Sequence, residues 1–289
     1  MHIDIDRFRV APGRRIHLGR WATRVKDFYR SKDDYQDRLD RQIDDLRELQ
    51  DRLYAADSHA LLVIFQALDA AGKDGVIKHV MSGVNPQGCQ VYSFKHPSDM
   101  ELDHDFLWRT AVCLPERGRI GIFNRSYYEE VLIVRVHPDM IRAQRIPGVE
   151  KATTSLWEQR YQSIRDHERH LIRNGTRILK FYLHLSKKEQ RKRLLARIED
   201  ETKNWKFNLG DLEERELWPR YMAAYEACLA ATSTREAPWY CVPADDKKNT
   251  RLIVAQAIVE ELKRLHPSYP KVDAAQQRKL KKIARTLEA

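Results

Sequence analysis

The chain has 289 residues and a formal net charge of +10 at neutral pH, with 42% hydrophobic and 33% charged residues. This length and composition are typical of a globular protein with one large α/β domain or two small ones. No apolar run approaches the roughly eighteen residues that a membrane span requires, and Met1 to Val10 is too polar for a signal peptide. We therefore expect a cytoplasmic protein with no membrane partner.

The four cysteines, Cys89, Cys113, Cys228 and Cys241, are widely separated and form no CxxC pair. This spacing favours reduced core thiols over disulfides or a structural zinc site. The positive net charge indicates an anionic partner, whether nucleic acid, acidic lipid or a phosphate polymer. Charge alone cannot choose among these three.

The first thirty residues mix proline, glycine and arginine, and they predict an irregular arm. Leucine and isoleucine then recur at helical spacing between about residues 33 and 55, which predicts an amphipathic helix. The run Ala60–Leu68 is almost continuously apolar, as expected of a strand buried on both faces of a parallel sheet. A glycine-bearing turn and a helix over Val76–Met81 come next.

Strands and helices continue to alternate along the rest of the chain. Helices are expected from about 154 to 174, where Gly175 forms the C-terminal cap, and again after Ser186, which with Glu189 has capping-box spacing. Residues 273–289 predict a basic amphipathic helix. Further strands are expected at Gln90–Phe94, Arg119–Asn124, Arg177–Leu185 and Trp239–Val242. Strands joined by helical crossovers predict a parallel sheet covered on both faces, with no domain boundary.

The turn after the apolar strand, residues 67–75, reads Ala-Leu-Asp-Ala-Ala-Gly-Lys-Asp-Gly. A strand, a glycine-bearing turn and a helix N-terminus form the arrangement whose backbone N–H groups hold phosphate. Lys73 supplies the charge that neutralises the oxygens of a transferring phosphoryl group. Two positions depart from the standard phosphate loop, because Ala67 replaces its first glycine and Asp74 its magnesium-binding hydroxyl. The alternative is a turn that merely ends a strand, but its position after the most apolar strand favours a phosphate loop.

A carboxylate within such a loop is unusual, because it places negative charge beside the bound phosphates. Asp69 is expected to hold Mg²⁺ or to orient an incoming phosphate acceptor. The alternative is an Asx turn that closes the loop.

Four blocks of sequence carry a resemblance to the polyphosphate kinase 2 family, and they occur in the family's order. The first is Asp69-x-x-Gly72-Lys73-x-Gly75, which resembles the family's variant Walker A loop. The others are Ile120–Phe123 followed by Asn124-Arg125-Ser126-Tyr127-Tyr128-Glu129, then Trp205-Lys206-Phe207, and finally Ala237-Pro238-Trp239 with Ala244-Asp245-Asp246-Lys247-Lys248. Together they span about Leu62 to Leu252, which is most of the chain.

The resemblance implies a three-layer α/β/α P-loop fold with a parallel central sheet, similar to thymidylate kinase. A single kinase domain would then occupy residues 1–289, with a helical lid at about 95–115. The implied reaction is phosphate transfer from inorganic polyphosphate to AMP and ADP, and the reverse from ATP, with Mg²⁺ or Mn²⁺ as cofactor. The segment from Asn124 to Glu130 resembles the class III branch, which acts on both AMP and ADP. A homo-oligomer, either dimer or tetramer, is also implied.

The resemblance and the position of each residue at strand or helix ends predict three groups of site residues. The catalytic group is Asp69, Lys73 and Arg125, with Asp69 also the metal ligand. The residues expected at the nucleotide are Asn124, Glu129, Glu130 and Arg109. The residues expected at the phosphate polymer are Ala70, Ala71, Gly72, Lys73, Asp74, Gly75, Lys206 and Lys247.

Several of these side chains also have a purely structural interpretation. Glu129 and Glu130 open a predicted helix, where carboxylates favour the helix dipole. Phe106 and Trp108 could stack on adenine, although core packing is the better expectation for both. Lys203, Lys248, Arg135 and Arg193 are weaker candidates for the polymer groove, since most exposed cations are simply solvated. The histidines show no metal-ligand spacing, and no base is required because a phosphate oxygen is already a nucleophile.

Two other functions compete with the polyphosphate reaction. One is an ATP-dependent nucleoside monophosphate kinase, which the carboxylates Asp69 and Asp74 disfavour. The other is a nucleic-acid-binding P-loop ATPase. It lacks a recognition motif, and Asn124 stands at the Walker B position where a hydrolase requires a carboxylate. We therefore expect no nucleic-acid partner.

Overall fold

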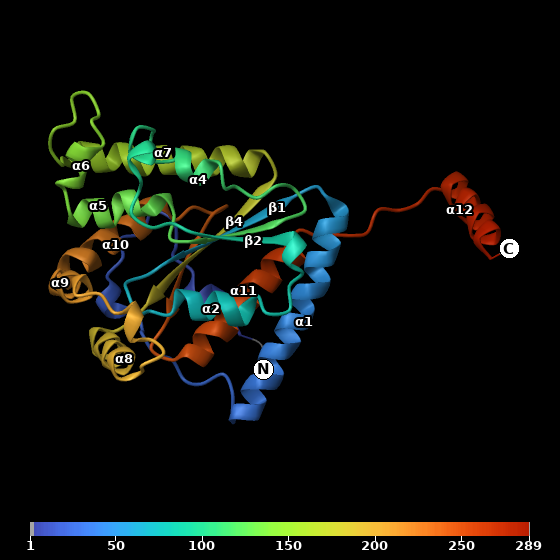
Figure 1. Ribbon diagram of the computed structural model, residues 1–289, viewed down its shortest axis with the longest axis horizontal. Helices are drawn as coiled ribbons and strands as arrows, with labels where there is room; N and C mark the ends of the chain where they lie inside the picture. Colours follow the sequence, from blue (N-terminus) through green and yellow to red (C-terminus); the bar gives the residue numbers. More distant parts are fainter. Residues whose placement is uncertain (1–2, 289) are drawn as a thin grey trace.

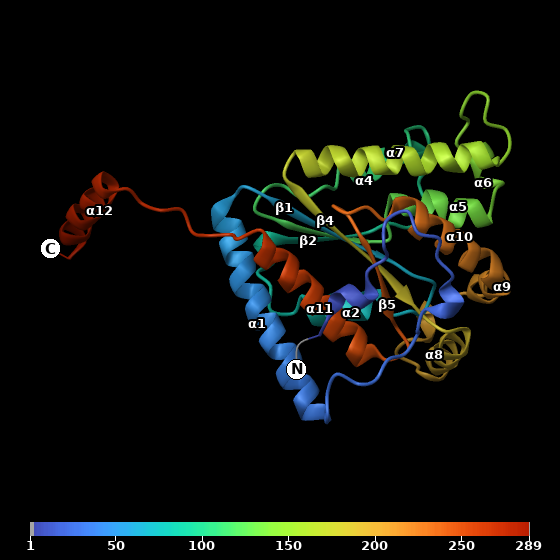
Figure 2. The ribbon, with the colours of Figure 1, turned by 180° about the vertical axis from the view of Figure 1, so that it is seen from behind.

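A parallel sheet forms the centre of the molecule (Figures 1 and 2). Its five strands lie in the order β2-β3-β1-β4-β5. The computed structural model describes residues 3–288, except for the side chain of Lys206. The strands are β1 (Ala60–Gln66), β2 (Cys89–Ser93), β3 (Ile120–Asn124), β4 (Thr176–His184) and β5 (Trp239–Pro243). The α/β class and the parallel sheet predicted from the alternating pattern are confirmed.

Each predicted strand is present, and its ends agree with the prediction to within two residues. The largest difference is at β1, which ends at Gln66 and not at Leu68. Its pairing with β4 stops at Gln66, opposite Tyr182. Ala67 and Leu68 are apolar but already belong to the loop, and an apolar run does not reveal where strand pairing stops.

One face of the sheet is covered by α1 (Lys32–Ala56), α2 (Lys73–Val80) and α11 (Lys247–Arg264). Ser31 caps α1 by accepting a hydrogen bond from the Asp34 N–H at 3.1 Å. The core on this face contains leucines from α1 and apolar residues of α11 that are almost wholly inaccessible to solvent.

The other face carries α7 (Thr154–Arg173), α10 (Trp218–Thr232), the 3₁₀ turn η4 (Tyr127–Val131) and the short α5 (Ile133–Val136). The predicted C-terminal cap of α7 is confirmed, since the helix ends at Arg173 and Gly175 has a φ of +91°. The two helical layers and the sheet make the three-layer arrangement expected from the sequence.

Shorter elements complete the described chain. The 3₁₀ turns are η1 (Ile5–Phe8), η2 (Leu18–Arg20), η3 (Pro86–Gly88) and η5 (Asn204–Lys206). The remaining helices are α3 (Asp99–Leu102), α4 (Trp108–Ala111), α6 (Met140–Ala143), α8 (Lys187–Glu199), α9 (Gly210–Glu216) and α12 (Ala274–Leu287). In α8 the hydroxyl of Ser186 caps the helix, but the Glu189 carboxylate bonds Arg193, so the expected reciprocal capping box does not form.

The two ends of the chain behave differently. The N-terminal arm is mostly irregular, as expected, but it is not loose: Phe8, Val10 and Leu18 are buried, and the Val10 N–H donates to the Trp239 carbonyl at 2.8 Å. In contrast, α12 projects from the body on an extended linker, and every described side chain in it is exposed (Figures 1 and 2).

All four cysteines are free thiols, and Cys228 and Cys241 are buried in the core. Burial raises the pKa of Cys228 to about 12, which keeps this thiol protonated and unreactive. Within residues 3–288, no helix combines the length and the apolarity needed to cross a bilayer.

Candidate functional site

The loop between β1 and α2 has the backbone geometry of a phosphate-binding turn. Ala70 and Gly72 adopt left-handed conformations, with φ of +61° and +101°. The predicted start of α2 at Val76 is wrong: the helix begins at Lys73, so that Lys73 and Asp74 form its first turn. Gly72 caps the helix without a side-chain hydrogen bond, which leaves the first-turn N–H groups available for an anion.

The replacement of the first loop glycine by Ala67 causes no backbone strain. Ala67 is not among the residues with positive φ, so its Cβ is tolerated. Its carbonyl accepts a hydrogen bond of 2.8 Å from the Lys73 ammonium. The alanine therefore fits this turn as well as a glycine would.

Lys73 is buried at the base of the loop, with 9% of its surface exposed. Burial and the neighbouring Arg125 lower its pKa, whereas the carboxylates of Asp69, Glu129 and Asp74 act in the opposite direction. Because burial and Arg125 disfavour its charged form, the Lys73 ammonium is stabilised further when an additional anion enters the site. The geometry thus suits a lysine that binds phosphate.

Arg125 leaves the carboxyl end of β3 in a left-handed conformation with φ of +67°. This conformation is costly for a residue with a Cβ and is often found at functional sites. The Arg125 N–H donates to the Phe65 carbonyl at 3.0 Å, and its guanidinium pairs with the Asp69 carboxylate at 2.9 Å. Against the effect of burial, Glu129 and Asp69 raise the pKa of Arg125, so the arginine remains a fixed positive charge.

Asp74, which replaces the usual hydroxyl of the phosphate loop, is hydrogen-bonded to the residue at the Walker B position. The Asn124 amide, at the Walker B position, donates to the Asp74 carboxylate at 2.7 Å. The carboxylate that is absent from β3 is therefore supplied by the first turn of α2. Mg²⁺ in kinases is usually held by one or two carboxylates together with substrate phosphates, and Asp69 and Asp74 line the same cavity.

A basic cavity of about 620 Å³ opens in front of this loop. Its wall includes residues 69–74, together with Lys95, Arg197, Lys203 and Lys247. Burial and the nearby cations Arg193 and Arg251 lower the pKa of Lys247. Such crowding of positive charge is relieved by a bound polyanion.

Arg193, a weaker candidate for the polymer groove, lines the basic cavity, and its side chain also supports the loop. Its guanidinium donates to the carbonyls of Ala70, Ala71 and Ala244 at 3.2, 2.8 and 2.6 Å. It also pairs with Glu189 at 3.0 Å. This arginine fixes the position of the phosphate loop relative to α8 and β5.

The other basic candidates have different surroundings. Lys203 lines the basic cavity and pairs with Asp200. Lys248 lies over the ring of Tyr29, and Arg135 contacts Tyr161, so both belong to packing contacts elsewhere. The side chain of Lys206 is outside the described part of the structure, and its predicted role stays a prediction.

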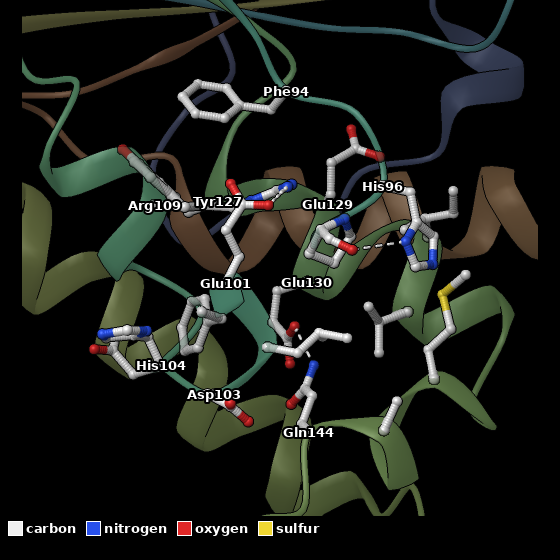
Figure 3. Close-up of a pocket in the computed structure, with 18 of the residues that line it drawn as sticks. Phe94, His96, Glu101, Asp103, His104, Arg109, Tyr127, Glu129, Glu130 and Gln144 are labelled. Atoms are coloured by element: carbon white, nitrogen blue, oxygen red, sulfur yellow. Dashed lines mark hydrogen bonds and ion pairs between the residues drawn. The ribbon is translucent and has the colours of Figure 1, made fainter. Parts of the chain in front are cut away.

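Figure 3 shows residues that line a second cavity, of about 560 Å³. Phe94, Lys95 and Arg125 line both cavities, so the two spaces meet at the carboxyl ends of β2 and β3. Its wall is more apolar and includes Phe106, Met140, Ile146 and Pro147. The short helices α3 and α4, inside the segment predicted as a lid, form one side of it.

Glu129 and Glu130 both line this second cavity, but they have different hydrogen-bond and ion-pair partners. Glu129 accepts a hydrogen bond from Gln66 at 3.0 Å. Glu130 is 6% exposed; its carboxylate pairs with Arg160 at 3.0 Å and accepts a hydrogen bond from Gln144 at 2.7 Å. Burial raises the pKa of Glu130, and Arg160 opposes this shift. Glu130 therefore contributes to the cavity wall as one half of an ion pair.

Of the two aromatic candidates for adenine stacking, Phe106 and Trp108, only Phe106 lines the second cavity. Phe106 lines the second cavity, with the Arg160 guanidinium 4.7 Å from its ring centre. Trp108 stacks on His104 at 3.9 Å and is absent from the cavity wall. Arg109 lines the cavity, lies over the Phe94 ring at 5.5 Å, and donates to the Lys95 carbonyl at 2.8 Å.

Among the residues that the structure describes, no three His, Cys, Asp or Glu side chains are grouped as a self-sufficient metal site. The donors at the loop still fit Mg²⁺, because this ion takes few protein ligands and completes its shell with phosphate and water.

The sequence analysis did not identify Lys95 and Arg197, which line the basic cavity. It also missed the Arg160–Gln144 pair of the second cavity. Lys95 could have been found, since it follows a predicted strand at the edge where open α/β sheets bind ligands. Arg197 and Arg160 lie within long helices, and nothing in the local sequence distinguishes them from surface arginines.

Comparison with known proteins gives a consistent result. The model of the family "Polyphosphate kinase 2 (PPK2)" matches residues 29–270. An "ADP-polyphosphate phosphotransferase" from Rhodopseudomonas palustris is 58% identical over 99% of both chains, and an "AMP/ADP-polyphosphate phosphotransferase" from Meiothermus ruber is 46% identical over 81% of this chain and 83% of its own. The crystal structure of polyphosphate kinase 2 from Arthrobacter aurescens TC1 superposes with a TM-score of 0.87 at 38% identity, covering 100% of this chain and 99% of the other. The chain belongs to the polyphosphate kinase 2 family.

Proposed function

We propose that this enzyme transfers phosphate from inorganic polyphosphate to AMP and to ADP, and that it runs the reverse reaction from ATP, with Mg²⁺ as cofactor. The observation that carries this proposal is the pair of adjoining cavities, one basic and one more apolar, that share Arg125. A phosphoryl donor and a nucleotide acceptor need two such spaces with a common charged boundary. The names of the two relatives, one citing ADP and the other AMP and ADP, support the same reaction.

In this proposal polyphosphate occupies the basic cavity, with its terminal phosphate on the N–H groups of residues 70–75. Lys203, Lys206 and Lys247 follow the polymer. The nucleotide occupies the second cavity, where Arg109, Glu129 and Glu130 with its partner Arg160 surround the acceptor. Asn124 fixes Asp74 at the boundary between them.

The chain's own residues act mainly by positioning and charge neutralisation. Lys73 and Arg125 lie where negative charge accumulates on the transferring phosphoryl group, and Asp69 holds Arg125 in place. An oxygen of the AMP or ADP phosphate attacks the terminal phosphorus of the polymer, and the shortened polymer leaves. Mg²⁺, when bound at Asp69, neutralises phosphate charge and helps to align donor and acceptor.

A time course that begins from AMP, polyphosphate and Mg²⁺, without ATP, tests this proposal. ADP should appear first and ATP later, because a uniform polymer can shift by one unit to meet an acceptor at either position. Accumulation that stops at ADP, or a reaction with ADP but not with AMP, would contradict the dual-acceptor proposal. Phosphorylation of AMP that requires ATP and ignores polyphosphate would favour the nucleoside monophosphate kinase instead.

The apparent affinity for polyphosphate should fall steeply with added salt, since binding a phosphate polymer releases counterions. Replacing Lys247 or Lys206 with alanine should each flatten the plot of log affinity against log salt by about 0.7, and weaken polymer binding more than AMP binding. Lys263→Ala is the matched control, because this lysine is exposed at the opposite end of α11 and pairs with Asp45. Equal slopes in all variants would place the polymer elsewhere.

We further propose that the enzyme is a cytoplasmic homo-oligomer, a dimer or a tetramer. The four free thiols accord with a reducing compartment. The exposed leucine and isoleucine side chains of α12 (Leu280, Ile283 and Leu287) accord with a further copy of the chain as partner. Light scattering at several concentrations would measure the assembly size.

A further inference from the structure

A fully buried ion pair lies beneath the turn that carries the site residues. Lys180 of β4 has no exposed surface and Glu168 of α7 has 1%, and the Lys180 ammonium lies 2.6 Å from the Glu168 carboxylate. The pair sits among the apolar residues that join the sheet to α7 and α10. The proposed reaction does not use either charge directly.

Every hydrogen-bonding position of the ammonium is filled. Lys180 donates to the Glu168 carboxylate at 2.6 Å, the Tyr128 hydroxyl at 2.9 Å and the Thr232 carbonyl at 2.8 Å. Burial lowers the pKa of Lys180, and Glu168 opposes this shift. Three acceptors match the three N–H groups of a protonated lysine, so the geometry fits the charged form.

The second oxygen of Glu168 connects the pair to the site. It accepts hydrogen bonds from the hydroxyls of Tyr127 at 2.9 Å and Tyr128 at 2.7 Å. Both tyrosines are buried, and burial together with Glu168 raises the pKa of each well above its usual value. Both hydroxyls therefore remain donors to a carboxylate that cannot move into solvent.

These two tyrosines occupy most of the short interval between Arg125 and Glu129. Arg125 and Glu129 both line the second cavity, so the turn between them decides where both charges lie. Figure 3 shows Tyr127 and Glu129 of this turn. Arg125 also has a left-handed backbone, which persists only when surrounding contacts hold it. The tyrosine contacts to Glu168 are such a restraint.

A purely stabilising role explains this pair poorly. Desolvating two charges is costly, and well-packed apolar residues at the same positions are often as stable as a buried pair. We propose that Lys180 and Glu168 are positioning residues: through Tyr127 and Tyr128 they hold the turn that presents Arg125 and Glu129 to the substrates. This inference rests on the proposed role of Arg125 in phosphate transfer.

The double variant Lys180→Met with Glu168→Gln tests the inference, because it removes both charges and keeps an acceptor for the tyrosines. Each single variant should lower the Tm sharply, since it leaves one buried charge without its partner. The double variant should recover much of the Tm, while kcat stays between about tenfold and a hundredfold below wild type with KM for AMP and polyphosphate little changed. Recovery of kcat together with the Tm would show that the pair is only structural.

A matched control and a milder variant guard against a general loss of folding. Arg177 and Glu261 form a 2.7 Å ion pair between β4 and α11, on the opposite face of the sheet. Arg177→Met with Glu261→Gln should change the Tm but leave kcat unaltered. Tyr127→Phe removes one hydroxyl while the ion pair remains, and it should lower kcat severalfold with a Tm shift within about 3 °C. An unaltered kcat in Tyr127→Phe would overturn the positioning role.

Coupling to Arg125 separates this inference from the proposed function. Arg125→Ala should reduce kcat strongly in the wild-type background but add little in the Lys180→Met, Glu168→Gln background, because Arg125 is already displaced there. Fully additive losses would overturn the positioning role and leave the function of Arg125 intact. No loss from Arg125→Ala in the wild-type background would overturn the proposed function of Arg125 itself.

Discussion

Replacing Lys73 with alanine should lower kcat at least about a hundredfold, which corresponds to roughly 3 kcal/mol of transition-state stabilisation. The ammonium is preorganised at the loop, with the Ala67 carbonyl as its hydrogen-bond acceptor at 2.8 Å. It lies close to Arg125, Asp69 and Asp74, where the proposed reaction requires neutralisation of the phosphoryl charge. The fold should survive, because a buried ammonium adds little stability after its desolvation cost.

The measurement is kcat with saturating ADP and polyphosphate, together with the Tm of the same preparation. Lys78→Ala is the matched control, since Lys78 is an exposed lysine of the same helix, α2. It should retain wild-type kcat. A Lys73→Ala enzyme that keeps wild-type kcat would show that the loop does not bind the transferring phosphate.

Replacing Asp69 with asparagine should lower kcat at least about tenfold, and excess Mg²⁺ should not restore it fully. Asparagine keeps the size of the side chain and its ability to form an Asx turn, but it loses the charge. The Arg125 guanidinium, 2.9 Å from Asp69, then loses its anionic partner. The side chains of Arg125 and Asp69 are each about one-third exposed, so the loss of their ion pair should change the Tm little.

A titration of Mg²⁺ at fixed polyphosphate and ADP checks this result. Asp166→Asn is a suitable control, because Asp166 forms an exposed ion pair with Arg169 on the surface of α7. Wild-type activity in Asp69→Asn would reduce Asp69 to a turn residue. Full recovery at high Mg²⁺ would limit its role to metal affinity.

The sheet and the phosphate loop were predictable because their signals are local. A strand buried on both faces must be apolar at nearly every position, as in Ala60–Gln66, and a glycine before a lysine predicts a helix start that can hold phosphate. The carboxyl-edge rule also located Arg125 at the end of β3. Even so, the start of α2 was misplaced by three residues, because Gly75 looked like part of the turn.

The supporting contacts could not be predicted in the same way, since each joins residues far apart in the chain. The Asn124–Asp74 hydrogen bond depends on β3 lying beside β1, and the Arg193 contacts depend on α8 reaching back to the loop. The sequence analysis therefore named Asp74 and Asn124 separately, and it considered Arg193 for the polymer groove but not as a support of the loop.

The sequence by itself determined the α/β class, the phosphate loop and the family's motif residues. Periodicity, turn chemistry and motif order depend on residues that are close together in the chain. The tertiary structure decided which charges line the two cavities and which are already paired. Glu130 is paired with Arg160. Lys180 is paired with Glu168, which accepts hydrogen bonds from Tyr127 and Tyr128. Burial and pairing depend on strand order and helix packing, and these bring together charges whose neighbours in the sequence give no sign of their partners.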